Sequence, residues 1–363
     1  MTDSFEPHSA QPADFPSAVT QVLRKYFDRR QPEIERIGGA VARSVDHLRD
    51  FVLGGGKRVR PLYGWVGYLA GGGDDCGEDP LAVLRAVSSL EFIQACALIH
   101  DDIIDSSDTR RGAPTVHRLL ADKHRAGTWL GDPDHFGESA AILTGDLALV
   151  WAEDMLQDSG LTAAALRRTR EPWRAMRTEV IGGQLLDIAL EATGSEDPGQ
   201  ADAVNRFKTA AYTIERPLHL GAAIAGASAD TISQLRAYGR DVGIAFQLRD
   251  DLLGVFGDPE VTGKPASDDI REGKRTVLFA LALQSADDHD PETAQLLRSG
   301  IGSHDPHTIA EVTAAIERTG ARQAVEERID ALLDSGLAHL DRFDEHTQTV
   351  LDHLATHMAA RHK

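Results

Sequence analysis

The residues best suited to chemistry are three aspartates in the stretch HDDIID, namely Asp101, Asp102 and Asp105. They follow the apolar run LEFIQACALI, whose composition is that of a buried helix. Grouped carboxylates repel one another and are costly to desolvate, so a cation is expected among them. On a helix, Asp101 and Asp105 share one face because they are one turn apart. Oxygen ligands in this arrangement suit Mg²⁺, which keeps water and shares its coordination shell with substrate phosphates.

A second acidic cluster lies in FQLRDDLLGVFGD. It places Gln247, Asp250 and Asp251 at the carboxyl end of another apolar helix, with Asp258 just after it. One acidic run alone is more often a solvated helix face. Two helices that each end in carboxylates could face one another across a cavity and hold shared cations.

Basic residues flank both acidic clusters. GGGKRVRP presents Lys57, Arg58 and Arg60 after a glycine turn, and DTRRG adds Arg110 and Arg111. Near the later helices stand Lys208, Lys264, Lys274 and Arg275. Arginine grips phosphate with a two-pronged fork, and lysine offers a point charge. Each cation alone could serve solubility, but together with the aspartates they favour a diphosphate site.

Composition limits the remaining possibilities. The chain has 363 residues, of which 42% are hydrophobic and 26% charged, as in a protein with a large core. A net charge of -19 argues against nonspecific binding to nucleic acid or anionic membranes. Cys76 and Cys96 do not have the spacing of a zinc site or a disulfide framework. We find no run of about 18 apolar residues and no signal peptide, so we expect no membrane span and a cytoplasmic location.

The hydrophobic pattern predicts an all-α fold. From Ala18 onward apolar residues recur at spacings of three and four, and no stretch alternates as a strand would. We expect a flexible N-terminal tail over residues 1–17 and a single domain over 18–363. Gly-, Pro- and Asp-rich segments predict loops at 53–57, 70–75, 126–139, 192–202 and 257–274.

These stretches resemble those of the trans-isoprenyl diphosphate synthases, also called polyprenyl synthetases, and most of all a geranylgeranyl diphosphate synthase. The matching segments, in order, are GGKRVRP, EFIQACALIHDDIIDSSDTRRGAPTVH, GGQLLDI, FKTAAY and FQLRDDLLGVFGDPEVTGKPASDDIREGKRT. The resemblance implies a homodimeric helical bundle, the isoprenoid-synthase bundle, around a deep central cavity. It also implies Mg²⁺-dependent head-to-tail condensation of isopentenyl diphosphate with an allylic diphosphate, which is dimethylallyl, geranyl or farnesyl diphosphate.

The resemblance also assigns roles to individual residues. By it, Asp101, Asp105 and Asp250 would bind several Mg²⁺ ions, with Asp102 and Asp251 in support. The residues that would hold isopentenyl diphosphate are Lys57, Arg60, Gln94 and Arg111. Those that would hold the allylic diphosphate are Arg110, Lys208, Gln247 and Lys264, with Lys274 beside them and Thr209 near the developing cation.

One position departs from the family. The second motif normally reads Asp-Asp-x-x-Asp, whereas here Gly254 stands where the third aspartate belongs. The second motif would then bind metal through Asp250, with water or Asp258 completing the ligands. We therefore expect weaker metal binding. Restoring the carboxylate by Gly254→Asp should lower the Mg²⁺ concentration that activity requires.

Product length should depend on the helix beneath the first aspartates. With diphosphate held at Asp101 and Asp105, the hydrocarbon tail runs back toward the helix N-terminus, past Ala97, Cys96 and Ile93. Relatives that stop at farnesyl carry large aromatic residues at the positions of Cys96 and Ala97, which are small here. The floor should therefore lie one turn deeper, near Ile93, Phe92 and Ser89, which favours a geranylgeranyl product.

Three alternatives remain open. The first is a synthase that makes farnesyl or longer chains. The second is a class I terpene cyclase, which handles a single diphosphate and would not need the basic set of Lys57, Arg60 and Arg111. The third is a non-catalytic partner subunit, which would be expected to lose parts of the first aspartate motif.

Overall fold

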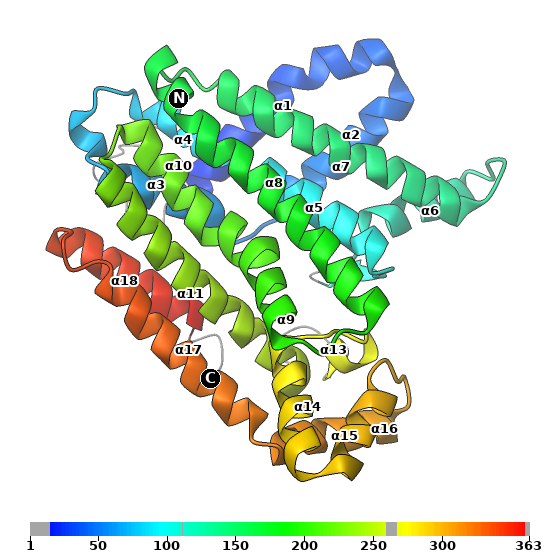
Figure 1. Cartoon of the computed structure of the whole chain (residues 1–363). Coiled ribbons are helices and arrows are strands. Elements are labelled where there is room, and N and C mark those ends of the chain that lie inside the picture. The colour runs from blue at the N-terminus through cyan, green and yellow to red at the C-terminus, as the bar shows by residue number, and fades with distance from the viewer. Residues whose placement is uncertain (1–14, 111, 259–266, 360–363) are drawn as a thin grey trace. The chain divides into compact units, whose positions relative to one another are not determined.

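The computed structural model describes residues 15–110, 112–258 and 267–359, and these are almost entirely helical (Figure 1). The predicted all-α class is confirmed. In the described ranges the one sheet is a small hairpin, in which β1 (Thr109–Arg110) pairs antiparallel with β2 (Ala113–Pro114). The chain forms two compact units, each built from two separated stretches.

The first unit comprises Met1–Trp173 and Pro217–Ile232. Its helices are α1 (Phe15–Ile37), α2 (Gly39–Leu53), α3 (Val59–Ala70), α4 (Pro80–Ser88), α5 (Leu90–Ile104), α6 (Val116–Ala126) and α7 (Pro133–Gln157), with a 3₁₀ turn at Gly73–Asp75. The second unit comprises Arg174–Arg216 and Ser233–Lys363. Its helices are α9 (Pro198–Val204), the π-helix η2 (Asn205–Glu215), α13 (Asp268–Arg271), α14 (Val277–His289), α15 (Pro291–Gly300), α16 (Pro306–Arg318), α17 (Ala321–Ala338) and α18 (Glu345–Ala359). The unit boundaries fall within α8 (Ala163–Thr193), α10 (Arg216–Ala225) and α11 (Ala229–Phe256).

The helix α5 is held by an aromatic cluster from α1 and α7. The Phe92 ring lies 5.4 Å from the rings of Tyr26 and Phe27, and edge-on at 6.1 Å to Trp151. All four side chains are buried. Edge and tilted contacts at these distances stabilise aromatic pairs beyond their buried area, so α5 has a fixed position in the first unit.

The stretch Pro80–Ile104, which contains α4 and α5, is long and apolar enough to cross a membrane by composition, with a mean hydropathy of 1.6. The expectation that no such stretch exists is therefore wrong. In the structure 72% of that window is buried inside the protein, and the helix is interrupted at Ser89. A buried core helix passes the same test, so the finding is weak support for a membrane span.

Several helices begin at Asp-Pro pairs. Asp132 caps α7 by accepting from the backbone N–H groups of Asp134 and His135, and Asp197 caps α9 in the same way. Proline suits the first helical position because its missing N–H would have no partner there. The predicted loops at 126–139 and 192–202 are therefore wrong over 133–139 and 198–202, where helix has already begun. The Pro- and Asp-rich composition predicted a loop at these places, whereas Asp-Pro here starts a helix.

Two other predicted boundaries also shift. The predicted tail over residues 1–17 is too long, because α1 begins at Phe15, whose buried ring lies 6.0 Å from that of Trp65. Residues 1–14 lie outside the described residues. In the predicted loop 257–274, the short helix α13 occupies Asp268–Arg271.

Glycines allow η2 to approach its neighbours in the second unit. A Cβ on Gly183 of α8 would meet the Lys208 backbone nitrogen at 2.2 Å. On α11, a Cβ at Gly239 would meet the Glu215 Cα at 2.6 Å, and one at Gly243 the Ala210 Cα at 2.7 Å. Any larger residue at these positions would push η2 away, so glycine here serves close backbone packing.

Candidate active site

The helix α5 presents one partly exposed stripe along its length, and near its carboxyl end His100, Ile103 and Ile104 are also at least partly exposed. Gln94, Ala97, Leu98, Asp101 and Asp105 are partly exposed, at the i, i+3, i+4, i+7 and i+11 spacing of a single helical face. Asp105 is the C-cap residue, so both carboxylates stand at the end of the helix where its dipole is negative. Carboxylates are unfavourable at that end, and a cation would offset both charges.

Asp102 has a different role from its neighbours. Its side chain is only 1% exposed, and its Oδ1 accepts a 2.7 Å hydrogen bond from Nε of Arg110 on β1. Nη2 of Arg110 also lies 3.4 Å from Asp101 Oδ2. The hairpin thus brings a guanidinium to the first aspartate motif, where an anionic substrate could be gripped. Asp102 therefore holds Arg110 in place, and its supporting role at the metal stays a prediction.

The basic stretch before α3 lies in the same unit as α5. Lys57 is exposed, whereas Arg60, in the first turn of α3, is buried. Arg58 between them is paired with Glu91 of α5. Arg111 falls outside the described residues, and so does Lys264.

In the second unit, Lys208 and Thr209 are partly exposed and lie on η2. Nζ of Lys208 lies 2.5 Å from Oδ2 of Asp187 on α8. π-Helical turns are rare and often occur at functional sites. The segment GGQLLDI matches the family and contains Asp187, but this aspartate was assigned no role from the sequence. An aspartate inside a matching segment was the signal that pointed to it.

The second acidic motif is organised around buried Asp251. Its Oδ1 accepts a 2.7 Å hydrogen bond from Nε2 of Gln247, and its Oδ2 lies 3.4 Å from Nδ2 of Asn205 on η2. Burial, reinforced by the nearby Asp269 charge, raises the pKa of Asp251 to about 7. Asp250 beside it is partly exposed, so its carboxylate is open to an ion. Gln247 donates to Asp251, and its predicted role in holding the allylic diphosphate stays a prediction.

The space beside Gly254 is filled by another carboxylate. A Cβ at this glycine would meet Oδ2 of Asp269 at 2.0 Å. Asp269 has Nζ of Lys274 at 3.7 Å, so Lys274 is directed at this acidic cluster. Sequence reasoning missed Asp269 because its contact with α11 comes from a separate element, α13. The contact with Asp269 argues against the expected gain from an aspartate at Gly254, since the position already faces a carboxylate.

We expect Gly254→Asp to destabilise the protein by about 1 to 3 kcal/mol, through overpacking against Asp269. The added negative charge also repels Asp269, so the Mg²⁺ requirement should not fall. Thermal unfolding and a Mg²⁺ titration of activity measure both effects. In Gly254→Asp/Asp269→Ala the contact is removed, and stability should recover in part. A single variant as stable as the wild type that needs less Mg²⁺ would contradict this expectation.

The predicted chain-length residues lie on different faces of α5. Ile93 and Ala97 are in line with Asp101 and Asp105, with Ile93 buried and Ala97 partly exposed. Cys96 is buried, and its Sγ lies 3.8 Å from Nδ1 of His100, whose Nε2 contacts the Ile142 carbonyl of α7. Burial raises the pKa of the Cys96 thiol to about 12, so it stays protonated and unreactive.

Two of the three residues predicted near the floor of the tail site, Phe92 and Ser89, make other contacts. Phe92 is inside the aromatic cluster with α1 and α7, and Ser89 is buried at the break before α5, with its hydroxyl bonded to the Ala86 carbonyl. Along the stripe from Asp105 toward the N-terminus of α5, the first buried residue is therefore Ile93, one turn before Ala97.

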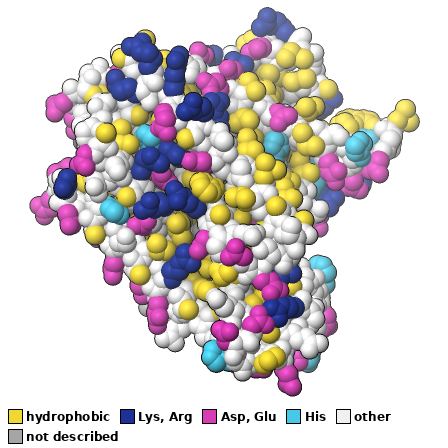
Figure 2. Space-filling view, in the orientation of Figure 1, with side chains coloured by type: hydrophobic (Ala, Val, Ile, Leu, Met, Phe, Trp, Pro, Cys, Tyr) yellow, Lys and Arg dark blue, Asp and Glu magenta, His cyan; other side chains and the backbone are white. Residues whose placement is uncertain are grey.

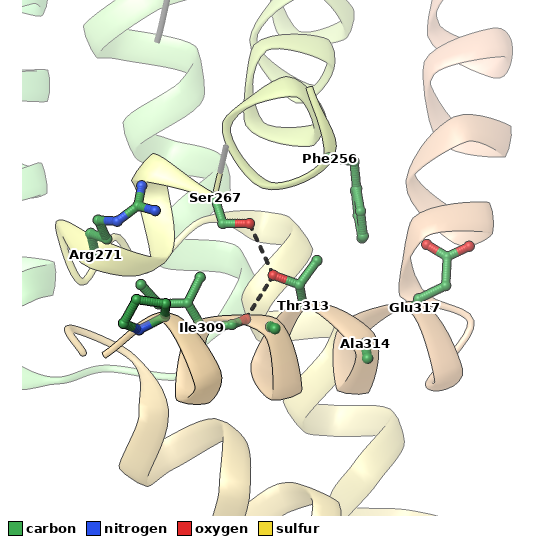
Figure 3. A pocket seen from close by; sticks show the side chains of 9 residues that line it. Phe256, Ser267, Arg271, Ile309, Thr313, Ala314 and Glu317 are labelled. Atoms are coloured by element: carbon green, nitrogen blue, oxygen red, sulfur yellow. Dashed lines mark hydrogen bonds between the residues drawn. The ribbon is translucent and has the colours of Figure 1, made fainter. Parts of the chain in front are cut away.

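A pocket of about 540 Å³ lies in the second unit (Figure 3). Its apolar wall is formed by Phe256, Ile309 and Ala314, with Arg271 and Glu317 at its sides. Its hydroxyl groups already bond to one another, as Ser267 Oγ lies 3.0 Å from Thr313 Oγ1. None of the residues predicted for the site lines it.

These carboxylates fit a Mg²⁺ ion whose coordination shell is supplied only partly by the protein. Across the described part of the chain, no group of three or more His, Cys, Asp or Glu side chains forms a complete metal site. Mg²⁺ is commonly held by one or two carboxylates, with water and phosphate oxygens completing the shell. Asp101 and Asp105 provide such a pair on α5, and Asp250 provides a single carboxylate on α11.

The comparisons with known proteins agree with this geometry. The polyprenyl synthetase family model matches residues 43–319. The short chain isoprenyl diphosphate synthase of Methanothermobacter thermautotrophicus is 33% identical over 313 residues, which are 84% of this chain and 86% of that protein. The (2E,6E)-farnesyl diphosphate synthase of Mycobacterium tuberculosis is 32% identical over 310 residues, covering 84% and 79% of the two chains.

Among solved structures, geranylgeranyl pyrophosphate synthase from Corynebacterium glutamicum, complexed with isoprenyl diphosphate and magnesium, is similar over almost its full length. It is 60% identical, with a TM-score of 0.94, and the match covers 97% of this chain and 100% of that one. The chain belongs to the polyprenyl synthetase family. Within that family it is a trans-prenyltransferase of the prenyl diphosphate synthase type.

Proposed function

We propose that this enzyme condenses isopentenyl diphosphate with allylic diphosphates to make geranylgeranyl diphosphate, in the presence of Mg²⁺. The observation that carries the proposal is the stripe on α5, where two carboxylates stand at the helix end and small or apolar residues lie beneath them. Such a face can hold a charged head group by a metal and an apolar tail along the helix. The Corynebacterium glutamicum structure, whose complex contains isoprenyl diphosphate and magnesium, supports the same ligands here.

The chemistry needs charge stabilisation and no protein nucleophile. The bond between the allylic carbon and the diphosphate oxygen breaks, and its electron pair leaves with the diphosphate. The double bond of isopentenyl diphosphate supplies the electrons of the new carbon–carbon bond, and a proton is lost from the adjacent carbon. Bound Mg²⁺ would supply positive charge next to the leaving diphosphate.

The chain's own residues hold the reactants in this scheme. Asp101 and Asp105 of the first unit would hold the metal, and Asp250 of the second unit offers a further carboxylate. Arg110, fixed by Asp102, donates to the departing oxygens, and charge already in place as the bond breaks is often the largest catalytic contribution. In the second unit, Lys208 on η2 is held by Asp187 and offers a further cation to a phosphate.

The direct test of this function is product analysis with each primer. Dimethylallyl, geranyl and farnesyl diphosphates are each incubated with labelled isopentenyl diphosphate and Mg²⁺, and the products are separated by chain length. We expect a geranylgeranyl product from all three. A farnesyl end product would favour the activity named for the Mycobacterium tuberculosis relative, and failure to consume isopentenyl diphosphate would contradict synthesis altogether.

Ala97→Phe is expected to shorten the product toward farnesyl. The new ring would fill the stripe one turn, about 5.4 Å, below Asp101, which is close to the length of one isoprene unit. Consumption of dimethylallyl diphosphate should stay within about twofold, because the charged groups are unchanged. The matched control is Ala95→Val on the buried side of α5. If the folded, active Ala97→Phe variant still makes the wild-type length, this face does not contact the tail.

We also propose that the enzyme is a cytoplasmic homodimer. The helix α7 exposes Ile142, Leu143 and Val150, and the tip of the α6–α7 hairpin exposes Trp129 and Leu130, the latter 97% exposed (Figure 2). Apolar side chains gathered on one helix and its hairpin are typical of an interface, and a second copy would cover them. Sedimentation equilibrium tests this, and a monomer at micromolar concentration would contradict it.

A further inference from the structure

A buried ion pair lies beside the basic stretch that opens α3. Nη1 of Arg58 contacts Oε2 of Glu91 on α5, and the two side chains are only 3% and 5% exposed. Among the described residues, Nε and Nη2 of Arg58 and Oε1 of Glu91 have no hydrogen-bond partner. A buried pair is a net stabiliser only when its remaining polar atoms are also satisfied. This pair is therefore a poor source of stability.

The backbone at Arg58 is also held in an uncommon conformation. With φ 50° and ψ 41° it is left-handed, a region that residues other than glycine rarely adopt. The Arg58 carbonyl accepts a 3.0 Å hydrogen bond from the Leu62 N–H and so begins α3. The left-handed turn directs the Arg58 side chain into the protein while Lys57 before it stays exposed. The ion pair fixes this turn.

The pair joins two elements that carry predicted ligands of one substrate. Lys57 precedes Arg58 directly, and Arg60 follows it in the first turn of α3. On the other side, Gln94 comes three residues after Glu91, so the two lie on neighbouring parts of the same face of α5. All of these residues are in the first unit.

We propose that Arg58, through its ion pair with Glu91, is a positioning residue that sets the distance between Lys57 and Arg60 on one side and Gln94 on the other. It thereby shapes the pocket for the diphosphate of isopentenyl diphosphate without touching it. This inference rests on the proposed function. It assigns Arg58, whose charge is turned inward, a role distinct from that of the cations on either side of it.

The test replaces the pair by apolar residues of similar size, in Arg58→Met/Glu91→Leu. Removing both charges avoids leaving one buried and unpaired, so the protein should keep its melting temperature. We expect KM for isopentenyl diphosphate to rise about tenfold, because small misplacements of binding groups are costly. KM for the allylic primer and kcat at saturating isopentenyl diphosphate should stay within about twofold.

A matched control removes a similar pair in the second unit. Arg216 and Glu179 form a two-pronged pair, with Nε to Oε2 at 2.7 Å, and Arg216 is buried. In Arg216→Met/Glu179→Leu, KM for isopentenyl diphosphate should be unchanged. An equal rise in both double variants would overturn the inference, because any lost buried pair would then have the same effect.

The conservative variant Arg58→Lys keeps the charge and loses the planar fork. It provides a second test if the double variant does not fold, and we expect its KM for isopentenyl diphosphate to rise about threefold with kcat unchanged. A wild-type KM in whichever of these variants folds would overturn the inference. If the wild-type enzyme itself consumes no isopentenyl diphosphate, the proposed function fails instead, so the two failures are distinguishable.

Discussion

Asp101→Ala and Asp105→Ala should each lower turnover about a hundredfold to a thousandfold, the usual loss when one transition-state contact is removed. Either change leaves a single carboxylate on the exposed stripe of α5, in place of the pair that would hold a metal at the helix end. Steady-state turnover at saturating Mg²⁺ measures the effect. Both side chains are partly exposed, so the variants should fold normally.

Asp108→Ala is the control for these two variants. Asp108 lies just beyond α5 with its side chain 79% exposed, and its carboxylate accepts a 2.7 Å hydrogen bond from Nε of Arg118. Surface pairs of this kind contribute little, so turnover should stay within about twofold of the wild type. If Asp101→Ala is about as active as Asp108→Ala, the proposed role of Asp101 as a metal ligand is contradicted.

The second large effect is expected from Gly183→Ala. The added methyl would collide with the backbone of η2, at 2.2 Å from the Lys208 nitrogen and 2.6 Å from the Phe207 carbonyl carbon. Backbone cannot rotate away as a side chain can, so η2 must shift and carry Lys208 and Thr209 with it. A displacement of about 1 Å can cost about a hundredfold in rate. Overpacking should also lower the free energy of unfolding by about 1 to 3 kcal/mol.

The neighbouring residue provides a close control. At Gly182 an added Cβ would meet nothing within 4 Å. Gly182→Ala should therefore leave turnover unchanged, and it should raise stability by up to about 1 kcal/mol because alanine is the better helix former. Turnover and chemical unfolding of both variants make the comparison. Equal behaviour of the two would mean that the contact between α8 and η2 does not position Lys208.

The sequence predicted the helical class and the two acidic helix ends, because both depend on local patterns. Apolar spacing marked α5 and α11, and the charges that follow each run marked their ends. Two contacts join separate elements: that of Asp251 with Asn205 and that of Gly254 with Asp269. The spacing of apolar residues along one helix cannot predict such contacts. For the same reason Arg110 was predicted as a substrate ligand, without the contact to Asp102 that holds it.

The π-helix η2 could not be predicted for a different reason. Its FKTAAY segment has the apolar spacing of an α-helix, and the wider turn is visible only in the backbone, where the Arg216 N–H reaches the Ala211 carbonyl. The sequence alone does not show why glycines occur within α8 and α11, where the wider turn of η2 packs against them. Glycine within a helical pattern costs stability, and only the close approach of η2 accounts for Gly183 and Gly243.

The single stripe on α5 limits how product length can change during evolution. Each residue inserted into or deleted from this helix rotates everything beyond it by about 100°, because there are 3.6 residues per turn. A deletion between Ala97 and Asp101 would therefore turn the carboxylates away from Ala97 instead of shortening the tail site. Length variants in this lineage should arise by replacing side chains along the stripe, and the number of residues from Ile93 to Asp105 should stay constant among enzymes that make different products.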